Sequence, residues 1–142
     1  MFGFRIARVQ ARLSAQIAQL LRDHQRLSVM QWRVLFMLDA LGKTTPAEIV
    51  RETGLDKGQL SRTIRDMTER GLLEAVPNTD DMRGQVIDFS ERGRALFQKV
   101  RPLIYDRQDR LLSVMSEEER KTFIRVLDLL EDEMNRIDAE EN

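Results

Sequence analysis

Apolar residues recur every three or four positions at both ends of the chain, which predicts a long amphipathic helix at each end. Near the C-terminus the intervals alternate between four and three, the two-per-heptad seam of a helix that packs against a partner helix. The first stripe consists of Ile6, Val9, Leu13, Ile17 and Leu20, and the last of Phe123, Leu127, Leu130, Met134 and Ile137. Both stripes exceed what the neighbouring sequence can cover.

Start and stop signals mark the next helix at Leu27 to Gly42. Ser28 and Gln31 have the spacing of a capping box, in which each side chain bonds the other residue's backbone N–H. Trp32 follows on the apolar side, where it belongs to the core rather than to a cofactor stack. Gly42 ends the helix, as glycine commonly does.

Two short helices joined by a glycine-containing turn come next. Residues 45–48 (TPAE) predict a second capping box, with Pro46 at the first helical position, where its missing N–H costs nothing. Gly54 ends this helix and Asp56 caps the following one, which stops at Gly71. This is the helix-turn-helix pattern, whose second helix enters the DNA major groove mainly with its N-terminal residues.

The second helix of that pair has two different sides. Residues three and four apart share a side, so one side is apolar and should be buried: Leu60, Ile64 and Met67. The other side is polar and cationic: Lys57, Gly58, Gln59, Ser61, Arg62 and Arg65. Such side chains suit base edges and phosphates. Taken alone, the helix would be an ordinary solvated amphipathic helix, but its neighbours favour DNA binding.

A β-hairpin is expected after Gly71. Residues 72–76 and 85–89 are strand-like, and the spacer between them is rich in turn formers. The spacer carries Arg83, so the hairpin is typical of a DNA-contacting wing. The alternative is a solvated loop, because Asp80 and Asp81 partly offset the arginine.

Ser90 caps a third long helix, which continues to Met115, and Pro102 inside it should produce a kink. Ser116 and Glu119 predict another capping box at the start of the last helix. The fold class is therefore mainly α, a winged helix-turn-helix with a short β-hairpin wing and long N- and C-terminal helices. We expect one unit over residues 1–142. Its DNA-binding lobe should lie at residues 28–90, with the helix-turn-helix at 46–70 and the wing at 72–89. Residues 1–26 and 91–139 should form the flanking dimerisation helices.

The partner of the terminal helices is expected to be a second copy of the chain. An intertwined homodimer would cover both stripes and place two recognition helices at related half-sites. The competing arrangement is a monomer whose terminal helices fold back on each other.

Charge is distributed unevenly although the net charge is only −1. Residues 1–33 carry six arginines and one aspartate, whereas residues 116–142 carry ten acidic and four basic residues. The central residues 43–94 are nearly neutral, so attraction to DNA there depends on placement rather than on bulk charge.

Composition excludes several classes of protein. The absence of cysteine removes disulfides, thiol sensing and the commonest zinc sites, and it is compatible with a reducing cytoplasm, where we expect the protein. The longest apolar run, residues 34–38, is far too short to span a membrane. The arginine-containing start is better explained as a helix of the fold than as a transit peptide. With His24 as the single histidine, a surface or junction residue, we expect no enzyme activity, no metal and no cofactor.

Several motifs together resemble the MarR family of bacterial transcriptional regulators. The resemblance covers nearly the whole chain, in the order and spacing of the family, and rests on residues 27–35 (LSVMQWRVL), 45–49 (TPAEI), 54–57 (GLDK), 60–62 (LSR), 70–74 (RGLLE), 80–83 (DDMR) and 89–96 (FSERGRAL).

The resemblance implies a homodimer that binds a palindromic double-stranded DNA operator. Carried over residue by residue, it places Ser61 and Arg62 at the DNA, Lys57, Gln59 and Arg65 near it, and Arg83 in the wing. The family often has a second arginine where Met82 stands, and an acid followed by a base where this chain has Arg65 and Asp66. In the family that acid commonly orients the wing arginine, a role that Asp66 could take here.

Relatives of this kind commonly sense small aromatic or lipophilic effectors between the dimerisation helices and the DNA-binding lobe. The sequence identifies neither the effector nor the operator. We expect a ligand-responsive repressor; the alternative is a winged-helix-shaped interaction protein that does not bind DNA.

Overall fold

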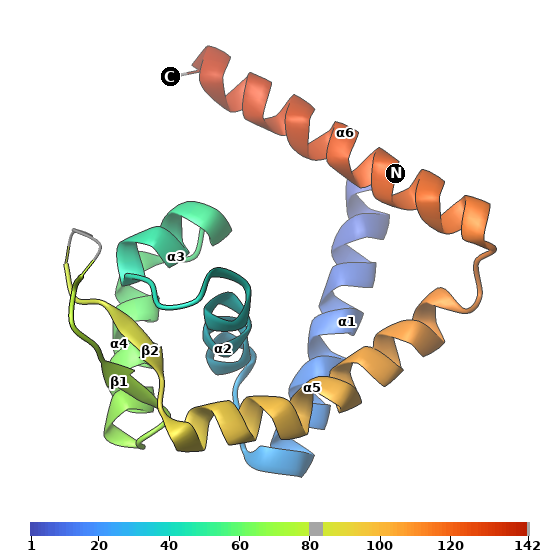
Figure 1. The fold of residues 1–142 in the computed structure, drawn as a ribbon. Coiled ribbons are helices and arrows are strands. Elements are labelled where there is room, and N and C mark those ends of the chain that lie inside the picture. The colour runs from blue at the N-terminus through green and yellow to red at the C-terminus, as the bar shows by residue number, and fades with distance from the viewer. Residues whose placement is uncertain (80–83, 142) are drawn as a thin grey trace. The chain divides into compact units, whose positions relative to one another are not determined.

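The computed structural model describes residues 1–79 and 84–141. These residues form six α-helices and a two-stranded antiparallel sheet (Figure 1). In chain order the elements are α1 (Phe2–Gln25), α2 (Val29–Leu41), α3 (Pro46–Thr53), α4 (Lys57–Glu69), β1 (Leu73–Ala75), β2 (Ile87–Phe89), α5 (Glu91–Leu112) and α6 (Glu117–Glu141). The fold class predicted from the sequence is confirmed.

The chain divides into two compact units, Met1–Ile104 and Tyr105–Asn142. The first contains the helix-turn-helix, the hairpin, α1 and most of α5. The second consists of the last turns of α5 and the whole of α6.

The predicted helix caps explain most of the helix boundaries. The capping box of α2 is closed in both directions, since Ser28 Oγ accepts from the Gln31 N–H at 3.1 Å and Gln31 Oε1 accepts from the Ser28 N–H at 2.9 Å. At α3 the prediction was half right. Thr45 Oγ1 accepts from the Glu48 N–H, but the Glu48 carboxylate accepts instead from the Thr44 hydroxyl at 2.7 Å.

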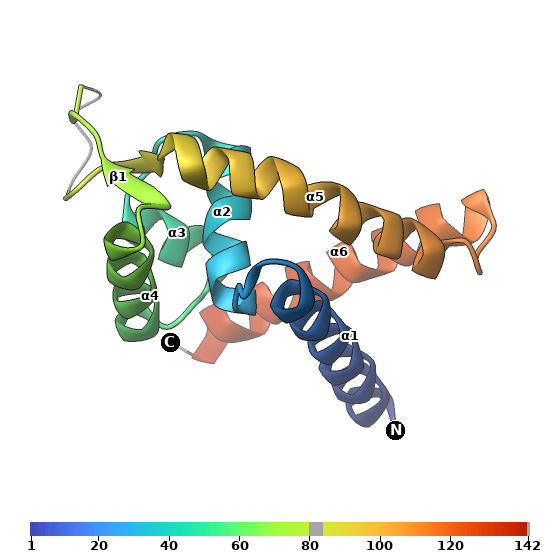
Figure 2. The ribbon, with the colours of Figure 1, turned by 90° about the horizontal axis from the view of Figure 1, so that it is seen from below.

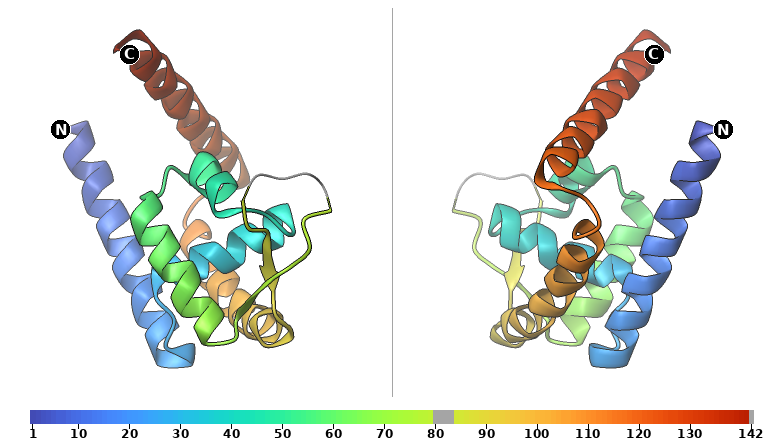
Figure 3. Two further views of the ribbon diagram at one scale, coloured as in Figure 1. Left: turned by 90° about the vertical axis from the view of Figure 1, so that its left-hand side faces the viewer. Right: turned by 90° about the vertical axis from the view of Figure 1, so that its right-hand side faces the viewer.

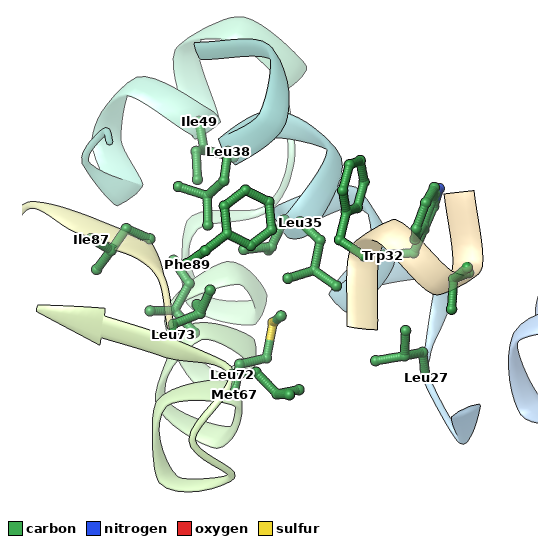
Figure 4. Close-up of a cluster of buried hydrophobic side chains, with 14 of the residues drawn as sticks. Leu27, Trp32, Leu35, Leu38, Ile49, Met67, Leu72, Leu73, Ile87 and Phe89 are labelled. Atoms are coloured by element: carbon green, nitrogen blue, oxygen red, sulfur yellow. The ribbon is translucent and has the colours of Figure 1, made fainter. Parts of the chain in front are cut away.

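The core of the first unit is a single apolar cluster between α2, α4, the sheet and the start of α5. Leu35, Leu38 and Phe89 point into it, with Met67 of α4 below them (Figure 4). Trp32 is buried as predicted, and its ring stacks on Phe97 of α5 with 5.1 Å between ring centroids. Stacked aromatic rings stabilise the packing of α5 on α2 beyond the area that they bury.

The sheet is shorter than the sequence pattern suggested. Leu73 pairs with Phe89 and Ala75 pairs with Ile87. Ile87 also exchanges two backbone hydrogen bonds with Thr44, at 3.0 and 2.8 Å, so the segment before α3 forms an isolated bridge to the hairpin. This bridge was not predicted, because a single bridging residue leaves no pattern in the sequence. It ties the hairpin to the start of the helix-turn-helix.

Gly93 in the first turn of α5 sits against the hairpin. A Cβ placed there would lie 1.9 Å from the Leu72 carbonyl oxygen, which a real side chain never approaches so closely. The Ser90 N–H donates to the same oxygen at 3.1 Å, and the Ser90 hydroxyl donates to the Gly71 carbonyl and accepts from the Gly93 N–H. The helix therefore begins beside the turn that follows α4, and only glycine fits (Figure 2).

The two terminal helices differ sharply from that core. In α1 only Leu21 is fully buried, and the apolar residues of its first half are exposed. In α6 no residue is buried at all. The α5 helix continues through Pro102, and the predicted kink there stays a prediction.

Candidate nucleic-acid interface

The helix-turn-helix is formed by α3 and α4, joined by Gly54, Leu55 and Asp56. Gly54 has a φ of 65°, the left-handed conformation that ends a helix, and its N–H donates to the Val50 carbonyl. Asp56 caps α4 as predicted, with its carboxylate accepting from the Gln59 N–H at 2.7 Å. The turn is therefore held by one glycine conformation and one side-chain cap.

One side of α4 is buried and the other is open, in agreement with the spacing of its apolar residues. Leu60, Ile64 and Met67 are buried against the rest of the lobe. The opposite side is exposed along its N-terminal half and contains Lys57, Gly58, Gln59, Ser61, Arg62 and Arg65. Figure 3, left, shows α4 at the surface of the lobe with the hairpin beside it.

The cations on this side have no acidic partner. Among residues 1–79 and 84–141, no carboxylate lies within ion-pair distance of Lys57, Arg62 or Arg65. Elsewhere in the lobe arginines are engaged; Arg101, for example, lies 3.5 Å from an Asp39 oxygen. The N-terminal half of α4 therefore presents positive charge and hydrogen-bond donors at the end of the helix where the backbone dipole also favours anions.

Gly58 lies in the middle of this open side. A Cβ added there would meet Asp56 Oδ1 at 3.4 Å and Arg62 Nη1 at 3.5 Å. The Arg62 guanidinium therefore extends back along α4 toward its first turn. Gly58 itself is exposed, so no side chain covers the backbone of the first turn at this residue.

An open groove of about 320 Å³ runs along α4 toward the hairpin. It is lined by Pro46 of α3, by Ser61, Ile64, Arg65, Thr68 and Glu69 of α4, and by Gln85 at the hairpin. The groove brings together two of the predicted DNA-binding residues, Ser61 and Arg65, whereas the other described ones lie nearer the start of α4. Arg83, predicted to contact DNA from the wing, lies outside the described residues, as does Met82.

Asp66 lies on a different side of α4 from Arg65. Its Oδ2 accepts from Gln31 Nε2 of α2 at 2.8 Å and lies 3.9 Å from Arg70 Nη1. Arg70 Nη1 in turn donates to Gln31 Oε1 at 3.3 Å. This network joins the C-terminal half of α4 to the start of α2 and engages Asp66 with α2. Arg65 is the residue of the pair that faces the groove.

Sequence reasoning missed this network although it had identified Gln31. The capping-box spacing explained one set of hydrogen bonds, and nothing in the sequence indicated that the same side chain also contacts α4. The network positions α4 on α2 without using any residue of the open side.

The described residues contain neither a candidate metal site nor a membrane-spanning helix. Within the described ranges, no group of three or more acidic or histidine side chains could hold a metal ion. None of the helices in the same ranges has an apolar stretch of the length needed to span a bilayer. His24 is exposed near the end of α1.

A helix-turn-helix followed by a short hairpin that packs beside its second helix defines a winged-helix protein. The model of the MarR family matches residues 27–84, the part of the chain that contains α2, the helix-turn-helix and the first strand of the hairpin. Over this part, which is less than half of the chain, the protein is similar to the MarR family.

Two curated relatives are similar in sequence. The multiple antibiotic resistance protein MarR of Salmonella typhimurium is 27% identical over 73 residues, which are 51% of each chain, so the chain spans about half the length of that relative. The HTH-type transcriptional repressor IacR of Pseudomonas putida is 23% identical over 125 residues, 88% of this chain and 74% of that protein.

A solved structure supports the fold independently of the sequence match. The crystal structure of a mutant MarR from E. coli complexed with operator DNA has a TM-score of 0.79 and 22% identity, and covers 90% of this chain and 91% of that one. At this identity the likeness shows a shared fold.

Proposed function

We propose that this protein is a sequence-specific, double-stranded DNA-binding transcriptional regulator that acts as a ligand-responsive repressor. The observation that carries the proposal is the open side of α4. Cations and hydrogen-bond donors gather there on the N-terminal half of the second helix of a helix-turn-helix, and the cations have no acidic partner among the described residues. No ion pair with a described residue has to be broken before these cations bind a polyanion such as DNA.

The proposed contacts follow from side-chain chemistry. Arg62 can donate two parallel hydrogen bonds to a guanine edge, and Gln59 can pair in the same way with adenine. Lys57 and Arg65 flank them and would contact phosphates, with Ser61 bonding either a base or a phosphate. Arg83 is proposed to contact DNA from the hairpin.

We propose that the protein binds a palindromic operator as a homodimer, with residues 1–26 and 91–139 as dimerisation helices. The support is the exposed apolar stripe on both terminal helices. Ile6 and Val9 are 44% and 58% exposed, and Met134 is 53% exposed. Large apolar residues in such contiguous stripes mark interaction surfaces rather than solvated ones.

Similarity to the MarR family supports the remaining parts of the proposal. A small aromatic or lipophilic effector would release the operator, and repression would follow because an occupied operator excludes the transcription machinery. A regulator of this kind works beside the chromosome, so we place it in the cytoplasm. We assign it no catalytic role and no cofactor.

Selection of bound sequences from a random duplex pool tests DNA binding and operator symmetry together. We expect a pseudo-palindrome whose half-sites lie about one helical turn, or about 10 base pairs, apart. Binding should weaken steeply as salt rises, because displaced counterions favour dissociation. Failure to enrich any sequence at low salt would contradict the proposal and favour an interaction protein with a winged-helix shape.

Substitution of Arg62 tests its proposed base contact. Arg62→Ala should cost about 1 to 3 kcal/mol of binding free energy and relax specificity at one base position, because a bidentate contact is lost. Arg33→Ala, which removes an exposed arginine from α2, is the control and should bind normally. Equal weakening on all sequences would make Arg62 a phosphate contact, and unchanged binding would contradict its role.

A further inference from the structure

The first half of α1 has a basic flank beside its exposed apolar stripe. Arg5, Arg8 and Arg12 are spaced by three and four residues, so they share one side of the helix. Arg5 and Arg12 lie next to Val9, which is 58% exposed. All three arginines are exposed, and none of them makes an ion pair with a described residue.

The α6 helix has an acidic flank in the corresponding place. Glu131 follows Leu127 by four residues, and Asp138 follows Met134 by four, so both acids border the exposed apolar seam. Asp128 lies one turn before Glu131. Asp128 and Glu131 are exposed and form no ion pair with any residue that the structure describes.

We propose that the basic flank of α1 docks against the acidic flank of α6 in a second copy of this chain, and that this charge match selects the dimer partner. The inference rests on the proposed homodimer and goes beyond it, because it states which faces meet and what makes the pairing specific. In a two-fold symmetric dimer the contact occurs twice, once for each α1.

Both flanks have the arrangement that charge-coded helix pairs use. In coiled coils, charged residues bordering an apolar seam choose the partner and the orientation, whereas the seam itself provides adhesion. A single exposed ion pair contributes little, but like charges placed along an apolar contact disfavour the wrong partner strongly. Two acidic faces, or two basic faces, would therefore repel one another.

Two charge-reversed proteins test the proposal. The first carries Arg5→Glu, Arg8→Glu and Arg12→Glu, and the second carries Asp128→Lys, Glu131→Lys and Asp138→Lys. Glutamate and lysine are both good helix formers, and the reversals at residues 5 and 138, in the first and last turns, agree with the helix dipoles, so both helices should form. Each protein alone should have a dimer dissociation constant raised about 100-fold, as measured by analytical ultracentrifugation at low salt.

Mixing the two proteins shows whether the charged flanks meet between two chains or within one chain. In a heterodimer both α1–α6 contacts regain opposite charges, so an equimolar mixture should recover dimers, and native mass spectrometry should show them to be heterodimers. If charge is matched within one chain instead, mixing would restore nothing, and that outcome would overturn the proposal. Both sets of reversals in a single chain should restore the homodimer, which checks that the reversed helices still fold and dimerise.

A control variant and two further outcomes distinguish the charge proposal from the proposal that the protein is a homodimer. Ala7→Glu with Ala11→Glu adds acids to another side of α1 and should leave dimerisation unchanged. If the reversed proteins dimerise like the original, the charges are merely solvated, so the charge proposal fails while the homodimer stands. A monomeric original protein would overturn both.

Discussion

The winged-helix lobe and α6 use apolar residues in opposite ways. In the lobe, side chains from α2, α4, the sheet and α5 close over one another, and Leu35, Leu60 and Met67 have no exposed surface. In α6, Phe123 and Met134 remain 46% and 53% exposed, and no residue is buried. The lobe is thus stabilised by its own sequence, whereas α6 carries an apolar surface that the proposed homodimer would cover. Changes in the two regions should differ in how their effects depend on protein concentration.

Gly93→Ala should break the lobe most severely. The added Cβ would collide with the Leu72 carbonyl, a backbone atom that cannot move without displacing the hairpin. We expect a loss of about 5 kcal/mol or more in the free energy of unfolding, enough to prevent folding of a marginally stable domain. Circular dichroism during denaturant titration measures it.

Gly58→Ala is the matched control, because its Cβ meets only ordinary contacts. Alanine favours helix, so this variant should be more stable by about 0.5 kcal/mol. Since Gly58 lies on the open side of α4, the same variant should bind DNA more weakly. If Gly93→Ala folded as well as Gly58→Ala, the close approach of α5 to the hairpin would be wrong.

Phenylalanine-to-alanine substitutions in the two regions sharpen the comparison. Phe97 is 2% exposed and stacks on Trp32, so Phe97→Ala should cost about 3 to 5 kcal/mol at every protein concentration. Phe123→Ala removes an exposed side chain and should act mainly on the dimer, so its effect on the melting temperature should grow at low concentration. Identical concentration dependence of the two variants would contradict the division between a closed lobe and an open α6.

Much of the lobe could be predicted from sequence because local signals agree with the tertiary structure. The caps at Ser28, Asp56 and Ser90 and the buried side of α4 were all predicted from spacing and confirmed. The failures have a common cause, which is contact between segments far apart in the chain. Glu48 bonds Thr44 instead of closing its box, and Thr44 forms a bridge to Ile87.

In the candidate interface, too, features of one helix could be predicted and contacts between helices could not. Which residues of α4 are exposed followed from helical periodicity, because that depends on one helix alone. The contacts of Asp66 could not be predicted in this way, because they depend on Gln31 at the start of α2 and Arg70 at the end of α4. The close approach of Gly93 to the Leu72 carbonyl had a weak signal in the sequence. A glycine within a predicted helix often marks contact with another backbone segment.

Asp66→Asn tests that network with a smaller effect. The carboxylate is half exposed and its ion pair with Arg70 is long, so we expect a loss of only about 1 kcal/mol in unfolding free energy. Binding of DNA should change little, because Asp66 faces α2. Glu69→Gln, on the groove side of α4, is the control for a lost acid. A large loss of DNA binding in Asp66→Asn would indicate that Asp66 positions the hairpin instead.

The smallest expected effect is at the start of α6. The Ser116 backbone N–H, together with the Ser116 hydroxyl, lowers the pKa of the Glu119 carboxyl, because these donors favour the charged form. A lowered pKa in the folded state means that the cap is fully stabilising above the ordinary glutamate pKa, and is lost as pH falls through the lowered value.

Nuclear magnetic resonance titration of Glu119 and exchange of the Ser116 amide hydrogen should report this loss together. In Glu119→Ala, the Ser116 amide should exchange quickly at every pH, whereas Glu117→Gln should leave it protected, since Glu117 pairs with Lys121 outside the capping box. If the Glu119 carboxyl titrates at the ordinary glutamate value, the capping box is open in solution. The first turn of α6 would then be set only by the second copy that the proposed homodimer places against its seam.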